Sequence, residues 1–159
     1  MKHLIFLFLF VPGLLLSQEF FVEPSSEFKM DSRIEPYVES FISDAEDRGF
    51  FLRSYLIDKI DYALFDNSVG MQPGDYTLGV VGLDKRGFYL SPAIESDPLV
   101  MRITVMHEIG HIIKKSGEHT CSNCYDIMSD SLPLDRSPFT NDVFWNLKVD
   151  EYFIWLNDN

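Results

Sequence analysis

One short motif constrains this chain more than any other feature, namely the H-E-I-G-H sequence at positions 107–111. Two histidines four positions apart on a helix share a face, with Cβ atoms about 5–6 Å apart, so both imidazoles can bind one metal ion. Glu108 projects beside them and can act as a general base without binding the metal. The chain has four histidines, of which one is His3 and the others fall between positions 107 and 119. This clustering argues against a chance match and predicts a zinc site at His107 and His111.

The motif lies in a stretch that predicts a buried helix from residue 98 to about residue 115. Asp97 or Ser96 can cap its first turn, and proline is favoured at the first helical position. The helix is apolar on nearly all sides, and ionisable groups buried in such a helix are costly unless a partner such as a metal ion compensates. We expect Gly117 to supply the left-handed residue that ends the helix. The chain then turns back, which makes His119 the candidate third zinc ligand.

Length and charge limit the classes of protein and partner. A chain of 159 residues suffices for one domain with a hydrophobic core and is short for two. Its formal net charge of −12 makes nucleic acid and anionic membrane surfaces unfavourable partners.

Residues 1–17 predict a signal peptide. A short basic start precedes an apolar run over residues 4–16, which is too short to span a bilayer and suits a signal-peptide core. The residues before position 17 fit the small-x-small cleavage pattern poorly, so an uncleaved anchor is the alternative. We expect a secreted or periplasmic protein whose single domain spans residues 18–159, with membrane contact only if the first segment is retained.

Cys121 and Cys124 are the only cysteines. Such a pair can form a local disulfide, a redox couple or half of a zinc site. The redox couple favours a strand-to-helix setting that the sequence does not indicate, and a four-thiolate zinc site needs two further cysteines. Because export permits disulfides, we expect a small disulfide that stiffens the loop after His119.

Periodicity predicts two further helices. Ser32 and Glu35 form a candidate capping box, which opens a helix that ends at Gly49. Its apolar stripe consists of Ile34, Tyr37, Val38, Phe41, Ile42 and Ala45. A final helix is expected from about Thr140 to Leu156, with Trp145, Val149, Tyr152 and Leu156 on its core face.

Strands are predicted in three places. A short strand is expected at residues 20–22. Residues 59–65 alternate between two faces and predict a strand with one solvent-exposed, or wet, face. Lys59, Asp61 and Ala63 lie on the expected wet face. Residues 76–82 and 87–91 form a candidate β-hairpin with a turn at 83–86. The expected fold class is therefore α+β, a small domain with a mixed or antiparallel sheet, an N-terminal helix, a buried helix with the motif and a C-terminal helix.

This order of elements resembles the metzincin zinc peptidases, whose signature is H-E-x-x-H-x-x-G-x-x-H followed by a methionine turn. His107, Glu108 and His111 match that signature directly. His119 is similar to its third ligand, and Met128 is similar to the methionine of the turn. The position of Cys121, close behind the third histidine, resembles the arrangement in the archaemetzincin branch of this family. Members of that branch carry more cysteines.

The chain also departs from that signature. Lys114 stands where the family has glycine, and seven residues separate His111 from His119 where the signature has five. Gly117 would have to serve as the turn glycine. Glu118, a cysteine, or a glutamate from a later helix such as Glu151 are alternative third ligands.

The resemblance implies a zinc metallopeptidase, and we expect an endopeptidase that acts on peptides or proteins. His107, His111 and His119 would bind Zn²⁺, and Glu108 would take a proton from the zinc-bound water. One strand of the hairpin at 76–91 would line the cleft and pair with substrate backbone. A non-catalytic, zinc-stabilised binding module and a hydrolase of a non-protein cell-wall amide are the alternatives.

Overall fold

The computed structural model describes residues 29–70, 77–122, 124–133 and 135–158. The expected signal peptide at 1–17 and the expected strand at 20–22 lie outside these residues. Within them, the chain forms a four-stranded mixed sheet and four α-helices, which confirms the expected α+β class. None of the helices in this described part has the length and apolar character that a membrane span needs.

The sheet has the strand order β1-β2-β4-β3. Strand β1 (Lys29–Met30) pairs parallel with β2 (Tyr62–Phe65), and β2 pairs parallel with β4 (Gly87–Leu90). Strand β3 (Gly79–Val81) pairs antiparallel with β4 and forms one edge of the sheet. The predicted hairpin is therefore confirmed, and it places an open strand edge on one side of the molecule.

The predicted wet face of residues 59–65 is wrong. Lys59 ends helix α2 (Arg53–Lys59), so the strand itself begins only at Tyr62. Ala63 pairs with Phe88 of β4, and both side chains are fully buried. The polar residues that suggested a wet face lie before the strand, and Ala63 is apolar and small enough to pack in the core.

Helix α1 (Glu35–Glu46) has the predicted apolar stripe, and Val38, Phe41, Ile42 and Ala45 are buried on it. The predicted capping box is wrong, since no side chain caps this helix. The backbone carbonyl of Asp31 instead accepts hydrogen bonds from the amides of Ile34 and Glu35, at 2.8 and 3.2 Å. The amide that Ser32 was expected to cap is therefore already paired.

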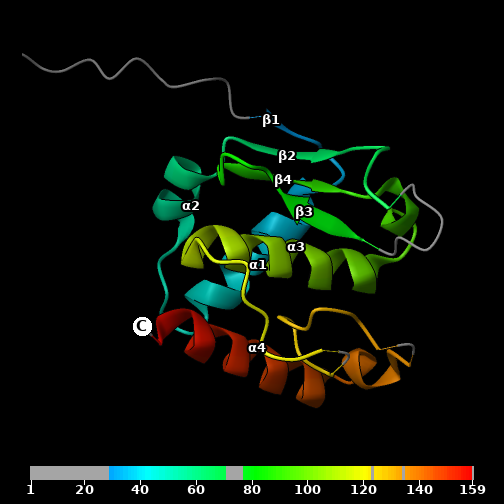
Figure 1. Cartoon of the computed structure of the whole chain (residues 1–159). Coiled ribbons are helices and arrows are strands. Elements are labelled where there is room, and N and C mark those ends of the chain that lie inside the picture. The colour runs from blue at the N-terminus through cyan, green and yellow to red at the C-terminus, as the bar shows by residue number, and fades with distance from the viewer. Residues whose placement is uncertain (1–28, 71–76, 123, 134, 159) are drawn as a thin grey trace, which may run out of the picture.

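Helix α3 (Pro98–Lys114) is the central element, as predicted. Its N-cap Asp97 accepts a hydrogen bond from the amide of Val100 at 3.1 Å, and proline occupies the first turn. Helix α3 packs against β3, β4, α1 and α4, so it lies between the sheet and the C-terminal helix (Figure 1). This position explains why it is apolar on nearly all sides.

The C-terminal helix α4 (Asp142–Asn157) begins slightly later than predicted. A 3₁₀ helix (Ser137–Thr140) precedes it, and the side chain of Asn141 caps it by accepting from the amides of Val143 and Phe144. A second 3₁₀ helix (Pro92–Ile94) precedes α3. Trp145, Val149 and Tyr152 are buried on α4, which confirms most of its predicted core face.

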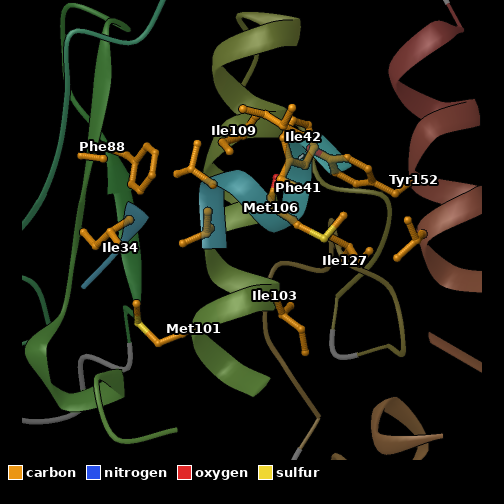
Figure 2. Packing of buried hydrophobic residues seen from close by; sticks show 14 of the residues in the cluster. Ile34, Phe41, Ile42, Phe88, Met101, Ile103, Met106, Ile109, Ile127 and Tyr152 are labelled. Carbon is orange, nitrogen blue, oxygen red and sulfur yellow. Dashed lines mark hydrogen bonds between the residues drawn. The ribbon is translucent and has the colours of Figure 1, made fainter. Parts of the chain in front are cut away.

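The hydrophobic core surrounds α3 (Figure 2). Phe88 approaches the helix from the sheet, Tyr152 approaches it from α4, and Phe41 and Ile42 come from α1. Burying a side chain of this size contributes about 1.5–3 kcal/mol. The motif helix is therefore fixed on several sides before any ligand binds.

Candidate metal centre

The three predicted histidines come together. Helix α3 supplies His107 and His111, and the loop after the helix supplies His119. Their ring centroids are 4.6, 5.0 and 5.1 Å apart, and one ligand nitrogen from each ring lies within 4.8 Å of the others. This group could hold a metal ion.

Hydrogen bonds fix the ring orientation of the two helical histidines. Nδ1 of His107 lies 2.8 Å from the carbonyl oxygen of Ile127, and Nδ1 of His111 lies 2.9 Å from that of Ser116. A carbonyl oxygen can only accept, so each Nδ1 carries the proton and donates. Metal-binding histidines generally donate their second ring nitrogen in this way, and the partner fixes the tautomer.

The positions of the two Nε2 atoms show whether a metal ion suits these histidines. The Nε2 atoms of His107 and His111 lie 2.9 Å apart. Both are lone-pair acceptors in the neutral tautomers set by Nδ1, so they repel one another unless a cation lies between them. Burial lowers the pKa of His107 to about 4 and also lowers the pKa of His111, which keeps both rings neutral near pH 7. Neutral imidazoles with converging lone pairs are suitable metal ligands.

His119 reaches the group although its spacing differs from the metzincin signature. Its side chain is 30% exposed, and its Nδ1 lies 3.6 Å from Oδ1 of Asp130. The predicted role of Gly117 is wrong, because the left-handed residue that ends α3 is Lys115, with φ of 53°. The backbone carbonyl of Lys115 accepts a hydrogen bond from Nζ of Lys85 at 2.8 Å, which holds this turn against the hairpin.

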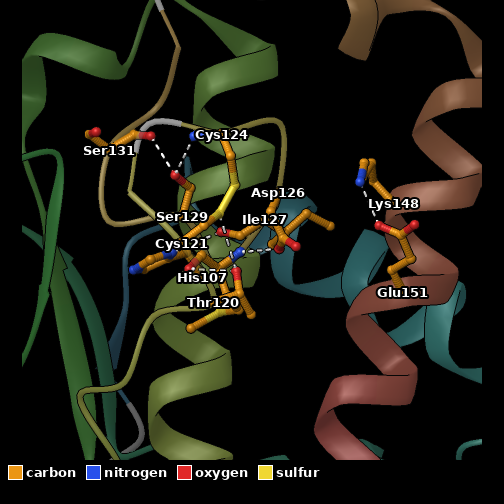
Figure 3. Close-up of a disulfide and its surroundings, with 11 residues drawn as sticks. His107, Thr120, Cys121, Cys124, Asp126, Ile127, Ser129, Ser131, Lys148 and Glu151 are labelled. Carbon is orange, nitrogen blue, oxygen red and sulfur yellow. Dashed lines mark hydrogen bonds and ion pairs between the residues drawn. A yellow bond between two sulfur atoms is a disulfide. The ribbon is translucent and has the colours of Figure 1, made fainter.

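The loop after His119 folds back on itself beside His107 (Figure 3). The amide of Thr120 donates to the carbonyl of Met128 at 3.0 Å, and the amide of Asp130 donates to the carbonyl of Cys121 at 2.8 Å. The predicted disulfide between Cys121 and Cys124 is present. The loop therefore carries His119 at one end and the carbonyl that orients His107 near the other.

Glu108 lies beside the histidines and is almost completely shielded from solvent. Its side chain is 4% exposed, and burial raises its pKa to about 8. Among the described residues no hydrogen bond or ion pair to Glu108 is found. A Cβ atom on Gly79 of β3 would lie only 2.6 Å from Oε1 of Glu108, so the strand approaches this carboxyl closely. A side chain at position 79 would displace it.

A cleft of about 1000 Å³ opens over these groups. Its lining includes the three histidines, Glu108 and residues 77–83, which contain the edge strand β3. The strand predicted to line a cleft therefore does so. Met128 is fully buried against α3, where its Sδ would be 2.8 Å from a Cβ atom on Gly110, the neighbour of His111.

None of the alternative ligands, namely a cysteine, Glu118 and Glu151, belongs to the group of three histidines. The cysteines are bonded to each other, and Glu151 on α4 forms an ion pair with Lys148 at 2.5 Å. Sequence reasoning missed the carbonyls of Ile127 and Ser116 because backbone groups leave no sequence signal. It also missed Gly79, whose place in the predicted hairpin beside the motif helix was the only available hint.

Comparison with known proteins leaves the family of the chain open. The chain matches no protein-family model, no curated protein and no solved structure.

Proposed function

We propose that this protein is a zinc-dependent peptidase that hydrolyses peptide bonds in the cleft above α3. One observation carries the proposal: the unprotonated nitrogens of two oriented histidines converge, together with a third histidine, beside a buried glutamate that faces an open cleft. A structural metal site is normally closed by four protein ligands, whereas a hydrolytic site has three and keeps one position open.

The donor set favours zinc. Imidazole nitrogens suit several transition metals, and zinc binds them readily in the four-coordinate geometry that three histidines leave incomplete. When bound, zinc would lower the pKa of a water molecule to about 7 and polarise the carbonyl group under attack.

Glu108 is the proposed general base. The pKa of about 8 applies to the metal-free chain, in which burial disfavours the charged form. A cation held by the adjacent histidines favours the carboxylate and lowers that pKa, so Glu108 is charged near pH 7. It then accepts a proton from the attacking water and transfers it to the departing amine.

Strand β3 supplies the proposed platform for substrate. It is the edge of the sheet, it lines the cleft, and its free backbone groups can pair with an extended peptide. Val80 is 44% exposed on this edge. Substrate would therefore bind mainly through its backbone, with side-chain preference set by the rest of the cleft.

A metzincin-like fold and export belong to the same proposal. The fold is supported by the third histidine after a turn and by Met128 packed against Gly110, next to His111 on α3. Export through a cleaved signal peptide at 1–17 is supported by the Cys121–Cys124 disulfide, because disulfides persist mainly in oxidising compartments.

Cleavage of a diverse peptide library tests the function. The chain from position 18, loaded with zinc, is compared with its Glu108→Gln form, and products are identified by mass spectrometry. We expect cuts from the unmodified chain only, with loss of all cuts when a chelator removes the metal. Absence of cuts from a folded, zinc-loaded chain would contradict the peptidase and favour a binding module.

A further inference from the structure

Arg136 lines the same cleft as the three histidines and Glu108, but at a distance from them. Its Nη1 lies 3.3 Å from Oδ2 of Asp97, the residue that caps the N-terminus of α3. His107 follows Asp97 by ten positions on this helix, which corresponds to about 15 Å. Arg136 therefore marks the end of the cleft near the N-terminus of α3.

The guanidinium of Arg136 has hydrogen-bonding capacity left over. Its contact with Asp97 is its one hydrogen bond among the described residues, and at 3.3 Å it is long for a charge-assisted bond, typically about 2.7–2.9 Å. Oδ1 of Asp97 already accepts from an α3 amide. Nε of Arg136 is buried without a partner among the described residues. By contrast, Arg53 binds both carboxylate oxygens of Glu39, at 2.8 and 3.0 Å.

The backbone of Arg136 is well anchored, although its side chain is 38% exposed. Its carbonyl accepts the amide of Phe139 at 3.0 Å, and the Phe139 side chain is buried in the core. A donor group on a fixed backbone, with unused hydrogen bonds and partial exposure to a cleft, is prepared to bind an anion.

The direction of the edge strand shows which part of a substrate would meet Arg136. Strand β3 packs along α3 (Figure 1). Gly79, at the start of β3, approaches Thr104, whereas Lys85, in the turn after β3, reaches the end of α3 at Lys115. Strand and helix therefore run in the same direction. A peptide that pairs antiparallel with β3, the more stable arrangement, directs its C-terminal part toward Arg136.

We propose that Arg136 selects peptides that carry a carboxylate about three to five residues after the cleaved bond. This spacing follows from about 15 Å along the helix and about 3.4 Å per residue of extended peptide. The carboxylate is either a free C-terminus or an acidic side chain. Because the chain has a net charge of −12, attraction of an anionic peptide must come from local cations. Besides Arg136, the described lining of the cleft includes Lys85, which donates to the carbonyl of Lys115 at the opposite end of α3. The inference rests on the proposed peptidase activity.

Matched peptides test the inference. A library peptide is prepared with Glu or Gln at each of the positions three to five residues after the cut, and with a free or amidated C-terminus. Values of kcat/KM are measured for the zinc-loaded wild type, Arg136→Gln and Arg136→Lys. The control is Arg53→Gln, whose side chain lies on α2 outside the cleft lining. In parallel, retention of the whole library on the zinc-loaded Glu108→Gln chain, with and without Arg136→Gln, measures binding without cleavage.

Wild type and Arg53→Gln should prefer one carboxylate peptide over its neutral match by about ten- to hundredfold. Arg136→Gln should bring this ratio close to one, and Arg136→Lys should keep part of it. If amidation of the peptide removes the preference, the recognised carboxylate is the C-terminus. If replacement of Glu by Gln in the peptide removes it, the recognised carboxylate is that side chain. Should Arg136→Gln fail to bind zinc, Arg136→Lys decides: a retained ratio supports the inference, and loss of both zinc and ratio overturns it.

Failure of the two proposals can be told apart. A preference that is missing, or that survives Arg136→Gln, overturns the role of Arg136 and leaves the peptidase intact. A chain that cuts nothing, yet retains carboxylate peptides through Arg136, contradicts the peptidase and supports the arginine. A chain that cuts nothing and retains nothing overturns both.

Discussion

Substituting alanine for Gly110 tests the packing of α3 next to His111. A Cβ atom there would lie 2.8 Å from Sδ of Met128, 3.0 Å from Oη of Tyr152 and 3.2 Å from Cζ3 of Trp155. Tyr152 cannot move freely, because its buried hydroxyl donates to the carbonyl of Met106 at 2.7 Å. The added methyl group therefore has to displace side chains that are already close-packed.

The magnitude follows from opposing terms. Alanine gains about 1 kcal/mol over glycine in a helix. Overpacking a core costs about 1–3 kcal/mol, and disturbing a buried hydrogen bond costs about 1–3 kcal/mol. Together these terms predict that Gly110→Ala lowers the free energy of unfolding by about 1–5 kcal/mol. For a chain of this length, each kcal/mol lowers the melting temperature by about 2–4 °C.

Urea unfolding of the metal-free chain measures this effect, and a double-mutant cycle with Met128→Ala assigns it. Removing the thioether should relieve the part of the cost of Gly110→Ala that comes from the closest contact, so the two substitutions should couple. Stabilisation by about 1 kcal/mol, as at an exposed helical glycine, would refute the reasoning. An equal cost in both backgrounds would show that Met128 is not the obstacle.

Three further predictions concern the site and the surface. Gly79→Ala crowds the carboxyl of Glu108, and we expect kcat to fall about a hundredfold with zinc affinity retained; an unchanged kcat would rule out the close approach. Replacing Cys121 and Cys124 by serine frees the loop after His119. Calorimetry should then show about 10–100-fold weaker zinc binding, and equal affinity would show that the loop needs no disulfide. Hydrogen bonds from Arg33 lower the pKa of the Asp31 carboxyl from 3.8 to about 2. The charged Asp31 therefore stabilises the fold fully above about pH 4, and this stabilisation is lost as the pH falls toward 2. The urea midpoints of wild type and Asp31→Asn should converge at pH 2, and a difference that persists at that pH would contradict the prediction.

The sequence predicts the elements that local signals specify. Asp97 and Pro98 define the start of α3, and the spacing of His107 and His111 on one helical face brings their rings together. The hairpin of β3 and β4 likewise follows from two β-rich runs with a polar turn.

The parts that depend on distant contacts could not be predicted. The capping box failed because the carbonyl of Asp31 takes the amide that Ser32 would need. Gly117 looked like the end of α3, yet Lys115 adopts the left-handed conformation, and the hairpin binds its carbonyl. The orientation of His107 depends on the carbonyl of Ile127, twenty positions away. Each of these depends on backbone atoms that any residue type possesses.

The parallel pairing of β1, β2 and β4 was equally hidden. Strand β1 has two residues, and β4 lies beside β2 although β3 separates them in sequence. Such short strands carry no periodicity of their own. The wet face assigned to Ala63 was wrong for the same reason, since its burial depends on its pairing with Phe88.

Stepwise addition of zinc to the metal-free chain, with peptide cleavage and bound zinc measured together, tests the central claim most directly. Three histidines with an open position and one glutamate predict that cleavage rises with bound zinc and saturates at one ion per chain. The Glu108→Gln form should bind the same zinc and cleave nothing. Cleavage before zinc is added, or cleavage by Glu108→Gln at the wild-type rate, would contradict the proposed role of the centre.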